Sequence, residues 1–197
     1  MRKKAFNSNG YTFIEFLVVT IVVSIIGATI VSILSSTLRG TRKTNLVSSI
    51  RTNGNQAITQ MARLMKFAKN FEGVSVSGEV TTYLLDCQQD IPPDPTPTPT
   101  PVRYKYLKFI AEDDGEIIFR CDDVDATIAS NGASLIDIDT VKVSDNKCWF
   151  TCSQDRLTSR PVVGIYFQLR QKGESTFAES QFSIPFETSV VFKNLVK

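Results

Sequence analysis

Hydrophobic residues are concentrated near the start of the chain, in an uncharged run from Phe16 to Leu38 that ends at Arg39. At about 1.5 Å per residue, a helix over this run spans roughly 35 Å, more than the roughly 30 Å hydrocarbon core of a bilayer. A secretory signal has an apolar core of only about 7–15 residues followed by a small-residue cleavage site. This run is longer, and no Ala-x-Ala pattern follows it, so it predicts a membrane-spanning helix.

The charges on either side of the run predict its orientation. Arg2, Lys3 and Lys4 lie in the short basic segment 1–10 and, by the positive-inside rule, place the N-terminus in the cytoplasm. The cations between Arg39 and Lys43 favour the opposite orientation. We expect a single-pass protein with its N-terminus inside.

One carboxylate, Glu15, immediately precedes the apolar run. A charged side chain costs roughly 2.5–3.5 kcal/mol at the centre of a bilayer and less near its interface. The position of Glu15 therefore predicts a partner that compensates its charge. The alternative is a simple signal anchor that carries an incidental glutamate.

The segment Gly10–Val19 reads Gly-Tyr-Thr-Phe-Ile-Glu-Phe-Leu-Val-Val. With the basic leader before it and the apolar helix after it, this segment resembles the class III signal of type IV pilins and type II secretion pseudopilins. Tyr11 and Phe13 stand where Phe and Leu are commonest in that family, and both are bulky and apolar. The match to this signal covers only the amino-terminal part of the chain.

The resemblance implies processing at the N-terminus. A prepilin peptidase/N-methyltransferase would cleave between Gly10 and Tyr11, remove the leader 1–10 and methylate the new Tyr11 amine. In a filament, that ammonium is expected to pair with Glu15 of a neighbouring subunit, because an unpaired charge in an apolar core is costly. The helix 11–38 would then serve first as the transmembrane segment and afterwards in the filament core.

Beyond the membrane run, apolar residues recur at the three- and four-residue spacing of an amphipathic helix. We expect a stem helix over 39–72, either continuous with the membrane helix or separate from it. Gly40 and the Asn53-Gly54-Asn55 cluster are expected to bend or locally melt it. The positions expected to face a soluble core are Leu46, Ile50, Ala57, Met61, Leu64, Met65, Ala68 and Phe71.

Two further segments indicate a subtype. The stem from Arg51 to Lys69 and the stretch from Phe186 to Asn194 are similar to the stem and ending of J-type minor pseudopilins and their pilus counterparts. Phe192 and Lys193 replace the usual Leu and Arg of that ending. The alternative is an ending common to pilin-like C-terminal strands.

Residues 73–197 form the expected exported head, in which alternating apolar residues predict strands. Asp114-Gly115 predicts a tight hairpin turn. A long helix followed by antiparallel strands is an α+β fold, here the pilin fold. The expected strands are Val80–Leu85, Tyr104–Phe109, Glu116–Arg120, Leu135–Val143, Lys147–Thr151, Val163–Leu169 and Ser183–Phe192.

The segment 91–101 differs in composition from the rest of the head, since it holds six of the eight prolines. Proline fixes φ and lacks a backbone donor, so the Pro-Thr alternation predicts polyproline II conformation in an exposed spacer loop. The alternative is a threonine-glycosylated or partner-binding loop.

The four cysteines, Cys87, Cys121, Cys148 and Cys152, predict two disulfides in an exported head. Three pairings are open. In one extended strand, Cys148 and Cys152 would lie about 13 Å apart, too far for a bond that needs Cα atoms within about 7 Å. Either the chain turns between them or, as we favour, they bond to Cys87 and Cys121. A four-cysteine zinc site is a weaker alternative.

Other chemistry has little support. The chain has no histidine, which excludes His-based triads and His metal sites. Asp122, Asp123 and Asp125 are weak calcium candidates that match no loop motif. From Arg39 onward the basic residues number 22 − 3 = 19 and the acidic ones 20 − 1 = 19, so there is no clear nucleic-acid signal. We expect no cofactor and no enzymatic activity.

The sequence therefore predicts a minor pilin or pseudopilin that is cleaved, N-methylated and assembled into, or at the tip of, a type IV pilus, type II secretion or competence pseudopilus, where it primes filament assembly. Its expected partners are other major and minor pilins, the peptidase, the inner-membrane assembly platform and the membrane. Its expected location is the cytoplasmic (inner) membrane and then an extracytoplasmic filament. The alternative is a single-pass anchored binding module with a disulfide-stabilised head.

Overall fold

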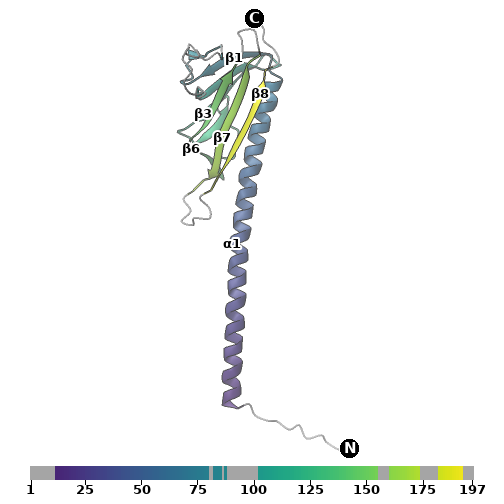
Figure 1. The fold of residues 1–197 in the computed structure, drawn as a ribbon, viewed down its shortest axis with the longest axis vertical. Helices are drawn as coiled ribbons and strands as arrows, with labels where there is room; N and C mark the ends of the chain where they lie inside the picture. Colours follow the sequence, from purple (N-terminus) through teal and green to yellow (C-terminus); the bar gives the residue numbers. More distant parts are fainter. Residues whose placement is uncertain are drawn as a thin grey trace, which may run out of the picture. The chain divides into compact units, whose positions relative to one another are not determined.

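The computed structural model describes residues 12–79, 82–85, 87, 102–154, 160–173 and 182–192. They form the predicted α+β fold, in which one long N-terminal helix is followed by antiparallel strands (Figure 1). The elements are α1 (Phe13–Lys66), β1 (Asn70–Ser75), β2 (Tyr106–Ile110), β3 (Glu116–Asp122), β4 (Thr127–Ser130), β5 (Ala133–Ser134), β6 (Val141–Ser153), β7 (Val162–Gln171) and β8 (Ser183–Val191).

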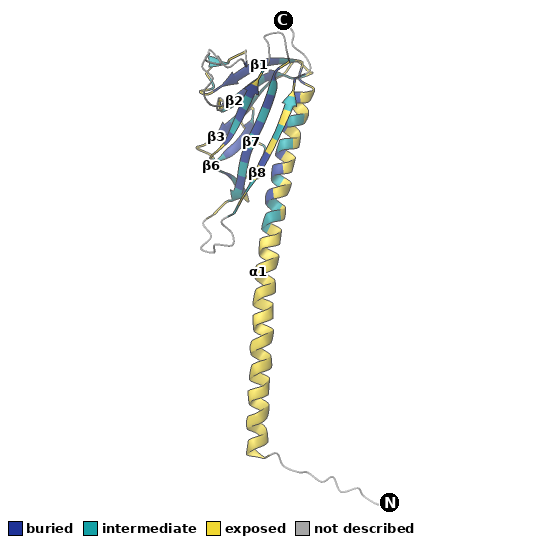
Figure 2. Cartoon of the chain, viewed as in Figure 1, coloured by how far each residue is buried: buried dark blue, intermediate teal, exposed yellow. Residues whose placement is uncertain are grey.

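The chain divides into two compact units between Asn45 and Leu46. In the first unit, every described residue of α1 is exposed, whereas in the second unit the helix buries one face (Figure 2). The buried positions follow one another at intervals of three or four residues, which confirms an amphipathic stem. Leu64, expected on this face, is at its margin and 38% exposed. The buried residues of α1 are Ile50, Gly54, Ala57, Met61 and Met65.

The helix α1 is continuous over its 54 residues. Gly40 and the Asn53-Gly54-Asn55 cluster lie inside it, so the expectation of local melting is wrong. The helix ends at Lys66 rather than near residue 72, because the chain from Asn70 onward pairs with β2 as strand β1.

The strands form two antiparallel sheets, one with the order β1-β2-β3-β4-β5 and one with the order β6-β7-β8. The Asp114-Gly115 turn is confirmed: it joins β2 to β3, with Asp114 at a φ of 63° and the Ala111 N–H donating to the Gly115 carbonyl at 2.8 Å. On β7, buried and half-buried residues alternate along the strand, with Gln168 and Arg170 on the outer face as predicted.

Three strand predictions were wrong in detail. Of Val80–Leu85, the described residues form no strand, and only Leu84 makes an isolated bridge, to Val74. Leu135–Val143 becomes a strand only at Val141, since a turn between Asp137 and Val141 precedes it. The two strands expected around Lys147 are one long strand, β6, with an irregularity in its pairing between Val143 and Cys148. Strands β1, β4 and β5 were not anticipated.

Gly54 has a packing role, although glycine has a low helix propensity. A Cβ placed on Gly54 would overlap the ring of Phe186 on β8. That ring cannot retreat easily, because Phe167 of β7 stacks on it with ring centroids 5.2 Å apart. The glycine therefore allows the sheet β6-β7-β8 to approach the stem part of α1 closely.

We expect Gly54→Ala to lower the free energy of unfolding of the head by about 1 kcal/mol, because overpacking of about 1–3 kcal/mol outweighs the gain in helix propensity of up to about 1 kcal/mol. Gly40→Ala is the matched control, since a Cβ there meets nothing within 4 Å. Urea denaturation followed by the fluorescence of Trp149, the only tryptophan, measures both variants. A Gly54→Ala head as stable as the native one would contradict this packing role.

Candidate functional site

The amino-terminal end of α1 is held by Thr12. The backbone N–H of Glu15 points to Thr12, 3.1 Å from its carbonyl oxygen and 3.4 Å from its Oγ1, and the Phe16 N–H donates to the same carbonyl at 3.2 Å. Thr12 is therefore the N-cap of the helix, and it satisfies donors that have no partner within the helix itself.

Glu15 is the third residue of this helix, an arrangement that the sequence interpretation did not anticipate. A Thr followed three residues later by a Glu is the spacing of a capping box, so Thr12-Phe13-Ile14-Glu15 carried the signal. A carboxylate in the first turn is also favoured by the positive end of the helix dipole. The helix start thus gives Glu15 partial local compensation, before any partner is considered. The predicted cleavage and methylation residues, Gly10 and Tyr11, lie outside the described residues.

Several hydroxyl groups in and just after the apolar segment donate to carbonyls of their own helix. Thr20 donates to the Leu17 carbonyl at 2.9 Å, and Ser24 donates to the Thr20 carbonyl at 2.7 Å. Similar bonds are made by Thr29, Thr37, Thr41 and Thr44. Because these side chains bond to their own helix, they add little polarity to a lipid-facing surface.

Among the described residues, α1 is long and apolar enough to cross a membrane, with a mean hydropathy of 2.8 in its most apolar window. None of that window is buried. Large side chains are exposed along the apolar part of α1, from Phe13 at 79% to Leu38 at 59%. An exposed apolar surface of this size is stable when lipid or other helices cover it.

Two disulfides stabilise the head, as predicted. They join Cys87 to Cys152 and Cys121 to Cys148, so each cysteine of the close pair bonds to a distant one. Cys148 and Cys152 lie on the single strand β6, in line with the spacing argument against a bond between them. The Cys121–Cys148 bond joins β3 of one sheet to β6 of the other.

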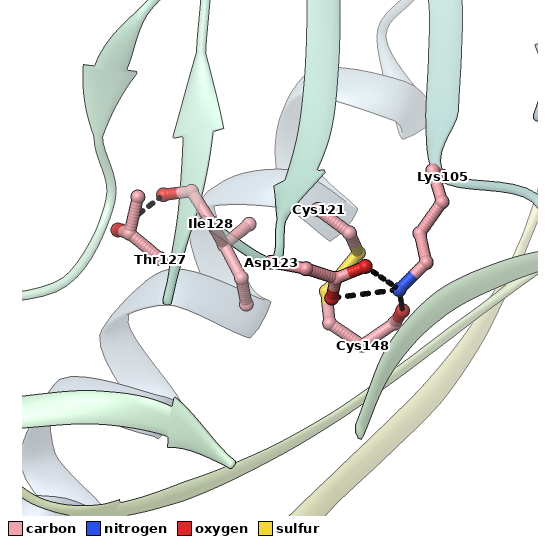
Figure 3. The surroundings of a disulfide bond; sticks show 6 residues. All are labelled: Lys105, Cys121, Asp123, Thr127, Ile128 and Cys148. Atoms are coloured by element: carbon pink, nitrogen blue, oxygen red, sulfur yellow. Dashed lines mark hydrogen bonds and ion pairs between the residues drawn. A yellow bond between two sulfur atoms is a disulfide. The ribbon is translucent and has the colours of Figure 1, made fainter. Parts of the chain in front are cut away.

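A lysine reinforces this connection between the sheets (Figure 3). The Nζ of Lys105 donates to Asp123 Oδ1 at 2.8 Å and to the Cys148 carbonyl at 3.0 Å. In addition, the backbone N–H of Cys121 donates to the Lys105 carbonyl at 2.8 Å. The Lys105 side chain therefore neutralises the charge of Asp123 beside the disulfide and connects the residue before β2 to β6.

The proline-rich segment 91–101 lies outside the described residues, but both of its flanks are fixed on β6. On one side, Cys87 is bonded to Cys152. On the other, Tyr104 and Phe150 exchange two backbone hydrogen bonds of 2.8 Å. Burial raises the pKa of the Tyr104 phenol above its ordinary value. The two anchoring positions on β6 are only two residues apart.

Two of the three aspartates considered for calcium, Asp122 and Asp123, have carboxylates that bond to other groups. Asp122 accepts a bond of 2.6 Å from Arg120 and caps its own turn by accepting from the N–H groups of Val124 and Asp125. Asp123 is paired with Lys105. Within the described part of the chain, no three metal-ligating side chains of the His, Cys, Asp or Glu type come together.

A surface stack on the outer face of β6 and β7 was also missed by sequence reasoning. Trp149 stacks on Tyr166 with ring centroids 4.1 Å apart, and the guanidinium of Arg103 lies 4.0 Å from the centroid of the Trp149 ring. Trp149 is thus held among these groups by stacking and cation–π interactions. Its fluorescence should report on the integrity of β6.

Comparison of the chain with family models, with curated proteins and with solved structures found no match. The fold resembles that of pilin-like proteins: a long apolar N-terminal helix followed by antiparallel sheets. The membrane-crossing length of α1 and the two disulfides indicate a membrane anchor with an extracytoplasmic head.

Proposed function

We propose that this chain is a minor pilin or pseudopilin of the J type. In this proposal, prepilin peptidase cleaves it between Gly10 and Tyr11 and the new amine is methylated. The subunit then enters, or caps, a type IV pilus, type II secretion or competence pseudopilus. Its function is to prime filament assembly with other pilins at the inner-membrane platform.

One observation carries the proposal: a lone carboxylate, Glu15, lies in the first turn of α1, whose apolar part in the first unit is exposed on all sides. A helix that only anchors a protein has no need of a charge at this depth, which raises the free energy of insertion. A helix that leaves the membrane to join a bundle gains from one, because a charged pair can fix the register between subunits. The amine four residues before Glu15, freed by cleavage, is the proposed counter-ion.

The competing function is a single-pass anchored binding module, and the capping geometry of Thr12 and Glu15 favours it. A carboxylate that only starts the helix would require neither cleavage nor a neighbouring subunit. The two functions differ in the covalent state of the N-terminus, which can be measured directly.

We expect the mature protein, extracted from the membrane of a host with an active prepilin peptidase, to begin at Tyr11 with one added methyl group. Intact-mass and N-terminal peptide mass spectrometry measure both changes. A Gly10→Val variant, which keeps every charge of the leader, should retain residues 1–10. Native protein that also retains its leader in this host would support the anchored module instead.

A further inference from the structure

A groove of about 770 Å³ lies within the second unit, between α1 and β8. On the helix side its apolar lining is Ile58, Ala62 and Phe67, and the Phe67 side chain is 54% exposed. On the sheet side it is lined by four consecutive residues of β8, 188–191. Consecutive strand residues point to opposite faces, so a groove lined by all four runs along the edge of the strand.

The backbone of β8 has unused hydrogen-bonding capacity on this side. Among the described strands, β8 is at the end of its sheet, paired only with β7. The Phe192 N–H donates to the Pro161 carbonyl at 3.1 Å, which makes the pair 161/192 a hydrogen-bonded one. Hydrogen-bonded and non-hydrogen-bonded pairs alternate along an antiparallel ladder, so Ser189 and Val191 of β8 are in non-hydrogen-bonded pairs with β7. Their backbone N–H and C=O groups therefore point away from β7, to the free edge of β8. Pro185, which has no N–H, is also in a non-hydrogen-bonded pair with β7, so the donor it lacks would have pointed to the free edge.

The groove also has a uniform charge. Arg63 and Lys66 line it from the helix and Arg160 from the segment before β7, and no carboxylate is among its described lining residues. None of these three cations takes part in an ion pair with a described residue. A strand edge beside an apolar helix face and three cations favours an extended ligand that carries negative charge.

We infer that this groove binds an extended acidic segment of a partner protein, which adds to β8 as a further strand. Its backbone pairs with Ser189 and Val191, alternate apolar side chains lie on Ile58 and Phe67, and its carboxylates meet Arg63, Lys66 and Arg160. A second copy of this chain is a poorer occupant, since pairing β8 with β8 would bring the same cations together in both copies. The inference does not depend on filament assembly.

The test uses the full chain in detergent micelles and a fluorescent synthetic peptide of alternating Asp and Val, with fluorescence anisotropy as the readout. We expect the acidic peptide to bind at least about tenfold more tightly than an alternating Lys and Val peptide. The double variant Arg63→Ser/Lys66→Ser should lose at least about tenfold in affinity for the acidic peptide. Lys147→Ser/Lys172→Ser is the matched control, with the same change of charge at exposed positions that do not line the groove.

A second variant tests the strand pairing. Ser189→Pro removes an N–H from the free edge only, as the native Pro185 does, so it should keep the head folded and weaken peptide binding. N-methylation of alternate peptide amides should weaken binding in the same way. Equal affinity for acidic and basic peptides, or binding unaffected by Arg63→Ser/Lys66→Ser, would overturn the inference. So would cross-linking that places a second copy of the chain in the groove.

Discussion

A chain carrying Glu15→Gln is expected to insert into the membrane normally and to enter filaments at least about 100-fold less than the native chain. Removal of one partner from a desolvated ion pair costs about 3–5 kcal/mol, since the remaining charge is left unpaired, and each 1.4 kcal/mol is a factor of ten. The ratio of the variant in sheared filaments to that in the membrane fraction, measured by quantitative immunoblot, gives the effect.

Glutamine is the informative replacement because it separates the two roles that the structure leaves open to Glu15. The Thr12 cap accepts from the backbone N–H of residue 15, which Gln also has, so the start of α1 should be kept while the charge is lost. Thr12→Ala makes the opposite change: it removes the capping oxygen and keeps the carboxylate. The pairing role predicts loss of assembly with Glu15→Gln and near-normal assembly with Thr12→Ala.

The reverse pattern would contradict the pairing role. If Thr12→Ala stops assembly and Glu15→Gln does not, Glu15 acts through the helix start alone. Glu15→Asp provides a further comparison, since it keeps the charge but shortens the side chain by one methylene. We expect it to assemble better than Glu15→Gln, because a shorter carboxylate still compensates a nearby ammonium.

The parts of the fold that the sequence predicted correctly are those set by local patterns. The membrane-length apolar run, the spacing of Ile50, Ala57 and Met61, and the alternation along β7 each depend on neighbours a few residues away. The Asp114-Gly115 turn is equally local, since it needs one residue at positive φ. Such features depend on neighbouring residues and not on contacts distant in sequence.

The parts that were missed depend on contacts distant in sequence. Phe71 was assigned to the stem by its helical spacing, but it lies on β1, where its backbone pairs with Phe109 of β2. Gly54 was considered a weak point of the helix, because only the fold brings Phe186 over it. The basic groove beside β8 has the same origin: Arg63 and Arg160 are far apart in sequence, and no local pattern joins them.

The cysteines lie between these two cases. The extended spacing of Cys148 and Cys152 argued against a bond between them, but it could not choose which of Cys87 and Cys121 each would meet. The choice follows from sheet topology, since β3 brings Cys121 beside Cys148 and Cys87 lies beside Cys152, near the end of β6. Covalent bonds placed in this way should contribute much of the head's stability.

Removal of the Cys121–Cys148 bond by the double variant Cys121→Ala/Cys148→Ala should lower the free energy of unfolding by about 3.5 kcal/mol, and Cys87→Ala/Cys152→Ala should lower it by about 4 kcal/mol. These values follow from the loop-closure entropy for separations of 27 and 65 residues. Paired replacement leaves no odd thiol from the broken bond. Urea denaturation in micelles, followed by Trp149 fluorescence, measures both effects.

The two variants should differ in more than size. Cys121–Cys148 joins the two sheets, and its loss leaves the Lys105 bonds to Asp123 and the Cys148 carbonyl as a remaining connection beside it. Lys105→Met should therefore destabilise the head more in the Cys121→Ala/Cys148→Ala variant than in the native chain. The reason is that each connection partly compensates for the loss of the other. A reducing agent should destabilise the native head and each double variant, and leave a chain without all four cysteines unchanged. Additive effects of Lys105→Met and the disulfide would show that the lysine does not support the junction between the sheets.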